Sequence, residues 1–153
     1  MRDEAAPNPT PLSGEEIQAR VHGSLAEYMG RSVLEQYALF MGKAQMLELG
    51  LKGLLTRRFD VPADDMERWT LGKTKNALAG RGLRSDFIEL LEGVVGHRNS
   101  MAHEFLVSSA ITRSIAKCSG RRLHGDLFRA LYEVEQIILI HDWCEENDAW
   151  LCE

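Results

Sequence analysis

The sequence of residues 85–105 is SDFIELLEGVVGHRNSMAHEF, and its apolar residues recur with the period of one helix face. These apolar residues are Phe87, Leu90, Leu91, Val94, Val95, Met101, Ala102 and Phe105. The pattern predicts an amphipathic helix that runs to about His103. Arg98 occupies a position of the same face, where a core residue is expected. Because a guanidinium is costly to bury without partners, this position predicts that Arg98 either forms a structural ion pair or lines a basic pocket.

Two helices are predicted upstream of this stretch. Ser13 followed by Glu16 has the spacing of a capping box, which predicts a helix over residues 14–29. Ser32 and Glu35 have the same spacing and predict a second helix over residues 32–58. This second helix has an apolar stripe formed by Val33, Tyr37, Phe40, Ala44, Leu47, Leu51 and Leu54.

The rest of the chain extends the helical pattern. Residues 64–79 predict short helices that end in a glycine turn over 80–82, and residues 107–122 predict a loop with one helical turn around 111–117. A last helix is expected over 125–146, with one face formed by Leu127, Leu131, Val134 and Ile138. The predicted fold class is all-α, an up-and-down-like bundle of four to five helices. Residues 1–12 are expected to be a flexible lead-in, and 13–153 a single domain.

The helix predicted over residues 32–58 also has a second face and three glycines. The second face carries Leu34, Ala38 and Met41, and then becomes polar at Gln45, Glu48 and Lys52. Gly42, Gly50 and Gly53 each lower helix stability relative to alanine. They indicate either the close approach of another helix or a weaker helix.

Length and composition limit the class of protein. The 153 residues predict one domain, no apolar run is long enough to span a bilayer, and no secretory signal is recognised at the start. The three cysteines form no CxxC pair, so we expect reduced thiols in a cytoplasmic protein. His97 and His103 lie six residues apart, which points their side chains in different directions and argues against a metal site.

The charge is unevenly distributed along the chain. Residues 52–122 carry 13 Lys and Arg against 8 Asp and Glu, whereas residues 123–153 carry 1 against 8. The formal net charge is −5, which argues against indiscriminate nucleic-acid binding. The positive excess surrounds Arg98 and His103, where an anionic ligand would require it, although differently charged solvated faces explain the pattern equally well.

The stretch Arg98-Asn99-x-x-Ala102-His103-x-Phe105 resembles the Arg-x4-6-His signature of the HEPN superfamily of compact helical domains. The layout is similar too, because a long helix precedes the motif and another helix follows it. The resemblance implies a metal-independent endoribonuclease that uses no cofactor, in a toxin or defence setting with a partner antitoxin protein. His103 would then transfer a proton at the ribose 2′-hydroxyl or at the leaving 5′-oxygen. Arg98 would stabilise the phosphorane, and Asn99 would orient the phosphate or His103.

Further residues are expected to assist this site. Lysine and arginine residues of the basic segment are candidate RNA contacts, and two polar residues of the preceding long helix are candidate supports beside the catalytic groups. The candidate RNA contacts are Arg57, Arg58, Lys73, Lys75, Arg121 and Arg122, and the candidate supports are Gln45 and Glu48.

Helical geometry adds a constraint on the motif. Five residues of regular helix place Arg98 and His103 about 140° apart, so they cannot reach one phosphate from one regular helix. Either the helix unwinds near residues 101–103, or a homodimer brings two motifs into one cleft, and the resemblance favours the homodimer.

Other interpretations remain open. Arg98 is also compatible with an ion pair to Glu48 or another carboxylate, and His103 with a cap at a helix C-terminus. Phe105 stands where one HEPN subgroup has a tyrosine that is modified for neutralisation, so that form of control is not expected. The alternative function is a non-catalytic helical module that binds protein or RNA.

Overall fold

The protein is described by a computed structural model that places the backbone of residues 10–105 and 120–152 and the side chains of residues 10–103 and 125–152. In these ranges the chain forms five α-helices and two short helical turns. They are α1 (Gly14–Tyr28), α2 (Val33–Phe59), η1 (Ala63–Met66), α3 (Leu71–Ala79), α4 (Ser85–Ser100), η2 (Met101–Phe105) and α6 (Gly120–Asn147). Among the described residues, the β-structure consists of an isolated bridge between Leu83 and Leu151. The predicted all-α bundle is confirmed.

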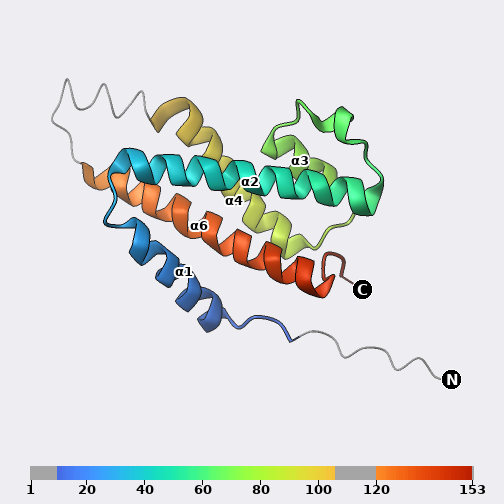
Figure 1. The fold of residues 1–153 in the computed structure, drawn as a ribbon, viewed down its shortest axis with the longest axis horizontal. Helices are drawn as coiled ribbons and strands as arrows, with labels where there is room; N and C mark the ends of the chain where they lie inside the picture. Colours follow the sequence, from blue (N-terminus) through green and yellow to red (C-terminus); the bar gives the residue numbers. More distant parts are fainter. Residues whose placement is uncertain (1–9, 106–119, 153) are drawn as a thin grey trace.

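Helix α6 is the centre of the bundle. It packs against α2, α4 and α1, and α3 lies beside the C-terminal half of α2 (Figure 1). The apolar stripes predicted from the sequence meet in the core. Fully buried side chains include Phe40, Leu51 and Leu54 of α2, Phe87, Leu91 and Val94 of α4, and Leu127, Leu131 and Val134 of α6.

Both predicted capping residues begin their helices. Ser13 forms a complete capping box with Glu16 at α1, and the Ser32 side chain accepts a hydrogen bond from the backbone N–H of Glu35 at α2. Helix α2 is capped at its C-terminus by Asp60, which adopts the left-handed conformation with a φ of 55° and donates its backbone N–H to the Leu55 carbonyl oxygen. These contacts satisfy helix-end groups that would otherwise lack partners.

The last helix differs from its predicted bounds. It begins at Gly120, not near 125, because a single glycine such as Gly125 is tolerated within a helix. Ile137 is fully buried and Ile138 only partly, so the core face of α6 is rotated slightly from the predicted one. The turn expected at residues 111–117 lies outside the described residues.

The start of α4 is tied to the C-terminal segment. The backbone N–H of Arg84 donates to the Trp150 carbonyl oxygen, and its guanidinium donates to the Ala149 carbonyl oxygen at 3.1 Å. Trp150 is 1% exposed and packs edge-on against Phe87. These contacts fix one end of α4, and the predicted motif lies at its other end.

No helix among the described residues is long and apolar enough to cross a membrane.

Candidate functional site

The predicted catalytic residues lie where α4 changes its helical geometry. Arg98 and Asn99 belong to the last turn of α4, and His103 belongs to η2, a short π-helical turn that continues it. Insertions of π geometry into α-helices occur often at functional sites. The spacing of Arg98 and His103 requires either unwinding or a second subunit, and a local change of helix type is present at residues 101–105.

The π turn changes the angle between Arg98 and His103. Each residue of a π turn rotates less about the helix axis than the roughly 100° of an α-helix. The total rotation from Arg98 to His103 therefore falls below the roughly 500° of a regular helix, and the two side chains lie less far apart around the axis. The change reduces the angle without removing it.

Arg98 occupies the core-facing side of α4. Its side chain is half-buried, and its neighbours on the same face, Leu91, Val94 and Met101, are buried. Within the described residues, Arg98 has no carboxylate within ion-pair distance. The alternative pairing with Glu48 is not formed. The Glu48 carboxylate accepts instead from the Lys52 ammonium group at 2.7 Å.

His103 and Asn99 are both exposed to solvent. Neither side chain forms a hydrogen bond or ion pair with another described residue. The described residues also contain no group of three or more His, Cys, Asp or Glu side chains that could hold a metal ion. The described polar groups of Arg98, Asn99 and His103 are a guanidinium, an amide and an imidazole on consecutive turns.

His97 anchors the segment that carries Arg98. Its imidazole Nε2 contacts the Glu133 carboxylate of α6, and the two side chains are 22% and 33% exposed. Gly93, one turn earlier on α4, leaves room for this carboxylate, because a Cβ there would lie 3.2 Å from Glu133 Oε2. The contact joins α4 to α6 one residue before the predicted catalytic arginine.

Sequence reasoning missed this anchor. The sequence points to His97 only as a possible metal ligand, and it gives no reason to select Glu133. The pattern within one helix gives no information on which residue of another helix faces it, so the pair had no signal in the sequence.

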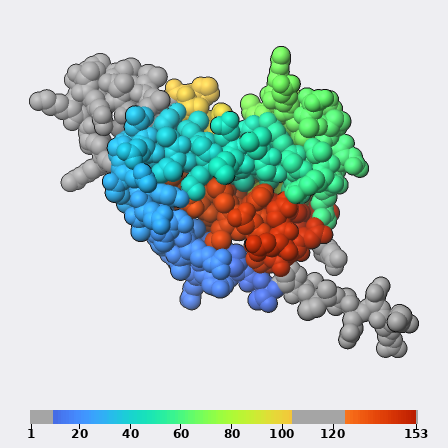
Figure 2. All heavy atoms as spheres, in the orientation of Figure 1, coloured from blue at the N-terminus to red at the C-terminus, as the bar shows by residue number. Residues whose placement is uncertain are grey.

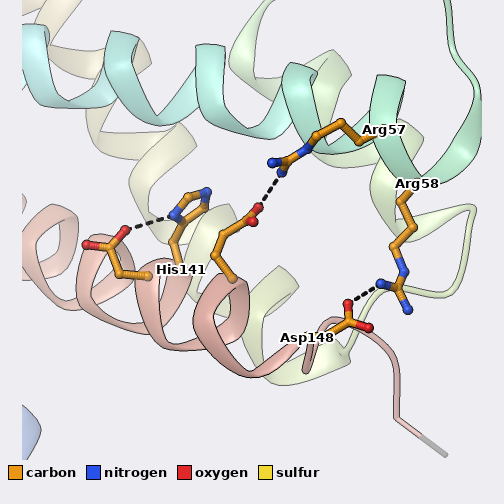
Figure 3. A network of polar contacts seen from close by, with 6 residues as sticks. Arg57, Arg58, His141 and Asp148 are labelled. Carbon is orange, nitrogen blue, oxygen red and sulfur yellow. Dashed lines mark hydrogen bonds and ion pairs between the residues drawn. The ribbon is translucent and has the colours of Figure 1, made fainter.

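Two of the predicted RNA contacts are engaged in ion pairs between helix ends. Arg57 and Arg58, in the last turn of α2, contact Glu145 and Asp148 of the C-terminal region (Figure 3). Nearby, His141 contacts its neighbour Asp142 at 3.1 Å. RNA binding by either arginine would require it to exchange a carboxylate for a phosphate.

The α3 lysines also have partners. Lys75 contacts the Glu92 carboxylate of α4, and the Lys73 ammonium group lies 5.1 Å from the centre of the Trp69 ring. Arg121 and Arg122 fall in the first turn of α6, where the side chains lie outside the described part of the chain. The role of these residues in RNA binding stays a prediction.

The two candidate supporting residues lie on α2. Gln45 is exposed, and Glu48 pairs with Lys52, whose ammonium group also donates to the Trp69 carbonyl oxygen at 2.8 Å. Within the described residues, neither side chain forms a hydrogen bond or an ion pair with Arg98 or His103.

No family model, curated protein or solved structure matches the chain. The function is therefore inferred from the motif and its surroundings.

Proposed function

We propose that the chain is a metal-independent endoribonuclease of the HEPN type, with Arg98, Asn99 and His103 as its catalytic residues. The observation that carries the proposal is the placement of Arg98. A half-buried guanidinium on an apolar helix face, without a carboxylate among the described residues, is a site prepared for an anion. The nearby π turn places an exposed imidazole on the following turn of the same segment.

These residue types match the demands of RNA cleavage. The 2′-hydroxyl oxygen attacks the adjacent phosphorus while the bond from phosphorus to the 5′-oxygen breaks, so RNA supplies its own nucleophile. His103 removes the proton from the 2′-hydroxyl or gives one to the leaving 5′-oxygen. Arg98 donates hydrogen bonds to the phosphoryl oxygens as negative charge accumulates on them. The products are a 2′,3′-cyclic phosphate and a free 5′-hydroxyl.

We include a homodimer in the proposal. The π turn reduces the angle between Arg98 and His103 but leaves them on different sides of the segment. Two copies that face each other across a two-fold axis would supply an arginine from one and a histidine from the other. The role as a toxin or defence component, with a neutralising protein partner, follows from the HEPN resemblance alone.

The test compares RNA with DNA of the same sequence in the presence of EDTA. The proposal predicts cleavage of the RNA alone, with a cyclic phosphate on the upstream product, because the reaction needs the 2′-hydroxyl and no metal. Cleavage of the DNA, or a requirement for a divalent ion, would contradict it. Binding of RNA without cleavage would support the alternative of a non-catalytic module.

A further inference from the structure

The stretch from Arg68 to Ser85 carries positive charge alone. It contains five lysine and arginine residues and no aspartate or glutamate, in a chain whose formal net charge is −5. The stretch covers the residues before α3, α3 itself and the turn that leads to α4. The acidic residues that precede it, Asp64 and Glu67, line the groove between η1 and α2. A local positive surface on an acidic protein attracts an anionic partner.

Three of these five cations are exposed and have no carboxylate partner among the described residues. They are Arg68, Lys73 and Arg81. The Arg81 guanidinium donates only to a backbone carbonyl oxygen of α3, at 3.0 Å. Lys75, in contrast, pairs with the Glu92 carboxylate. Arg84 pairs with Asp86 in the same way. The three exposed cations are therefore the ones that an anionic ligand can reach without breaking an ion pair.

Trp69 adds an aromatic ring to these cations. The ring is partly exposed, and the Lys73 ammonium group lies 5.1 Å from its centre. The backbone N–H of Trp69 donates to the Met66 carbonyl oxygen at 3.0 Å, and its carbonyl oxygen accepts from the Lys52 ammonium group at 2.8 Å. These bonds restrain the backbone from which the ring extends. We call Arg68, Trp69, Lys73 and Arg81 together the α3 basic surface.

The α3 basic surface begins beside the end of α4 that carries the proposed catalytic residues. Gly72 lies opposite Val95, because a Cβ at Gly72 would lie 3.4 Å from Val95 Cγ1. The Lys75 ion pair reaches α4 three residues earlier, so the two helices run antiparallel. The next step of three residues leads to Trp69 on one side and to Arg98 on the other. Figures 1 and 2 show η1 and α3, in green, and the end of α4, in yellow, along the same upper edge of the molecule.

We propose that the α3 basic surface binds a single-stranded segment of the RNA next to the linkage that is cut. The ring of Trp69 stacks against a base, and the three exposed cations contact phosphates. Stacking on an aromatic ring and charge neutralisation by cations are the interactions that hold single strands without reading their sequence. The choice of RNA as the ligand rests on the proposed function.

A single strand can replace the contacts that this surface makes in the free protein. Lys73 is held by an aromatic ring and not by a carboxylate, and a cation–π contact at an exposed site is weak. A base that stacks on Trp69 displaces the ammonium group, which then pairs with a neighbouring phosphate. Lys75 is not available in this way, because its side chain is 12% exposed and would have to leave Glu92. A duplex fits less well, because its bases are already stacked on one another.

The test measures binding of a 2′-O-methyl RNA strand of about 12 nucleotides. This strand lacks the 2′-hydroxyl nucleophile, so the proposed chemistry cannot cut it. Fluorescence anisotropy over a series of salt concentrations gives the affinity and its salt dependence. Arg68→Ala, Lys73→Ala and Arg81→Ala should each weaken binding at least about threefold and lower the slope of log K against log salt by about 0.7, because each removes one phosphate contact. Arg20→Ala, which removes an exposed arginine of α1, is the matched control and should change the affinity less than about twofold.

The role of Trp69 has its own measurements. Trp69→Ala should weaken binding about tenfold or more without changing the salt slope, because it removes a stacking surface and no charge. Trp69→Phe keeps an aromatic ring and should bind within about threefold of the wild type. The strand should also quench the tryptophan fluorescence of the wild type but not that of Trp69→Phe, which tests the contact even if Trp69→Ala does not fold. The strand annealed to its complement should bind at least about tenfold more weakly than the strand alone.

Failure of this inference and failure of the proposed nuclease give different results. The inference is overturned by a wild type that does not bind the strand, or by cation variants that all keep the wild-type affinity and salt slope, whether or not RNA is cleaved. A duplex bound as tightly as the strand, or quenching that persists in Trp69→Phe, would overturn the stacking of a base on Trp69. Binding with the expected losses but without cleavage of RNA would support the inference and contradict the nuclease.

Discussion

The imidazole of His97 on α4 contacts the carboxylate of Glu133 on α6, one residue before the arginine that we assign to catalysis. This contact joins the C-terminal turn of α4 to α6, the central helix of the bundle. It lies just before the helix changes to π geometry at Met101. The stability of this contact can be measured separately from any activity.

A double-mutant cycle measures the His97–Glu133 contact. We expect His97→Gln and Glu133→Gln each to lower the free energy of unfolding, and the double variant to lose less than the sum. The coupling should be about 0.5–1 kcal/mol, because both side chains remain partly exposed. Urea denaturation of the four proteins at neutral pH provides the measurement. A coupling of zero would show that the contact does not hold the two helices together.

Two glycines of α4 give a matched comparison. Gly96 is surrounded by open space, whereas a Cβ at Gly93 would lie 3.2 Å from Glu133 Oε2. Gly96→Ala should raise the free energy of unfolding by about 0.5–1 kcal/mol through the helix backbone alone. Gly93→Ala should raise the free energy of unfolding by less, because its methyl group displaces the Glu133 carboxylate from His97.

The Gly93 and Gly96 comparison has an internal control. In a Glu133→Ala background the methyl group at position 93 meets no carboxylate, so both alanine substitutions should stabilise the protein equally. Thermal denaturation of the six proteins supplies the measurement. A persistent difference between the two positions in that background would mean that Glu133 is not its cause.

Asp86 should make stability depend on pH at the acidic end. Hydrogen bonds from the Arg84 guanidinium hold the pKa of Asp86 below its ordinary value of 3.8. Because the pKa is lower in the folded state, the ionised carboxylate stabilises the protein above pH 3.8. This stabilisation is lost as the pH falls through the folded-state pKa. Asp86→Asn should therefore be less stable than the wild type at pH 7, and the two should converge in acid.

The size of the Asp86 effect is limited by solvent. The Asp86 side chain is 62% exposed, so the difference at pH 7 should be about 0.2–1 kcal/mol. Glu89→Gln, an exposed change on the same helix, is the control and should be nearly neutral at every pH. If Asp86→Asn and the wild type are equally stable at pH 7, the hydrogen bonds from Arg84 to Asp86 do not stabilise the folded protein.

The helices were largely predictable because their signals are local. Ser13 and Ser32 begin helices through contacts with backbone groups three residues away, and the apolar stripe of α2 has the period of one helix. Such features require no knowledge of other elements. The start of α6 was misplaced because Gly125 resembles a boundary, although a helix with a buried face tolerates one glycine.

The candidate site was less predictable than the fold. The position of Arg98 on the core face follows from spacing within one helix. The same spacing requires either unwinding near His103 or a second subunit. The Glu133 contact of His97 and the carboxylate partners of Arg57 and Arg58 depend on how separate helices are placed. No spacing within one segment carries that information.

The most direct measurement of the central claim is the rate of RNA cleavage in EDTA by the wild type and four variants. Arg98→Ala and His103→Ala remove the two proposed catalytic groups, and Arg20→Ala and His22→Ala remove an exposed arginine and an exposed histidine of α1. We predict that the cleavage rate falls at least about 100-fold in each variant of the first pair and less than about twofold in each variant of the second. All five proteins should be equally folded. Cleavage that survives both Arg98→Ala and His103→Ala, or a wild type that does not cleave RNA, would contradict the account.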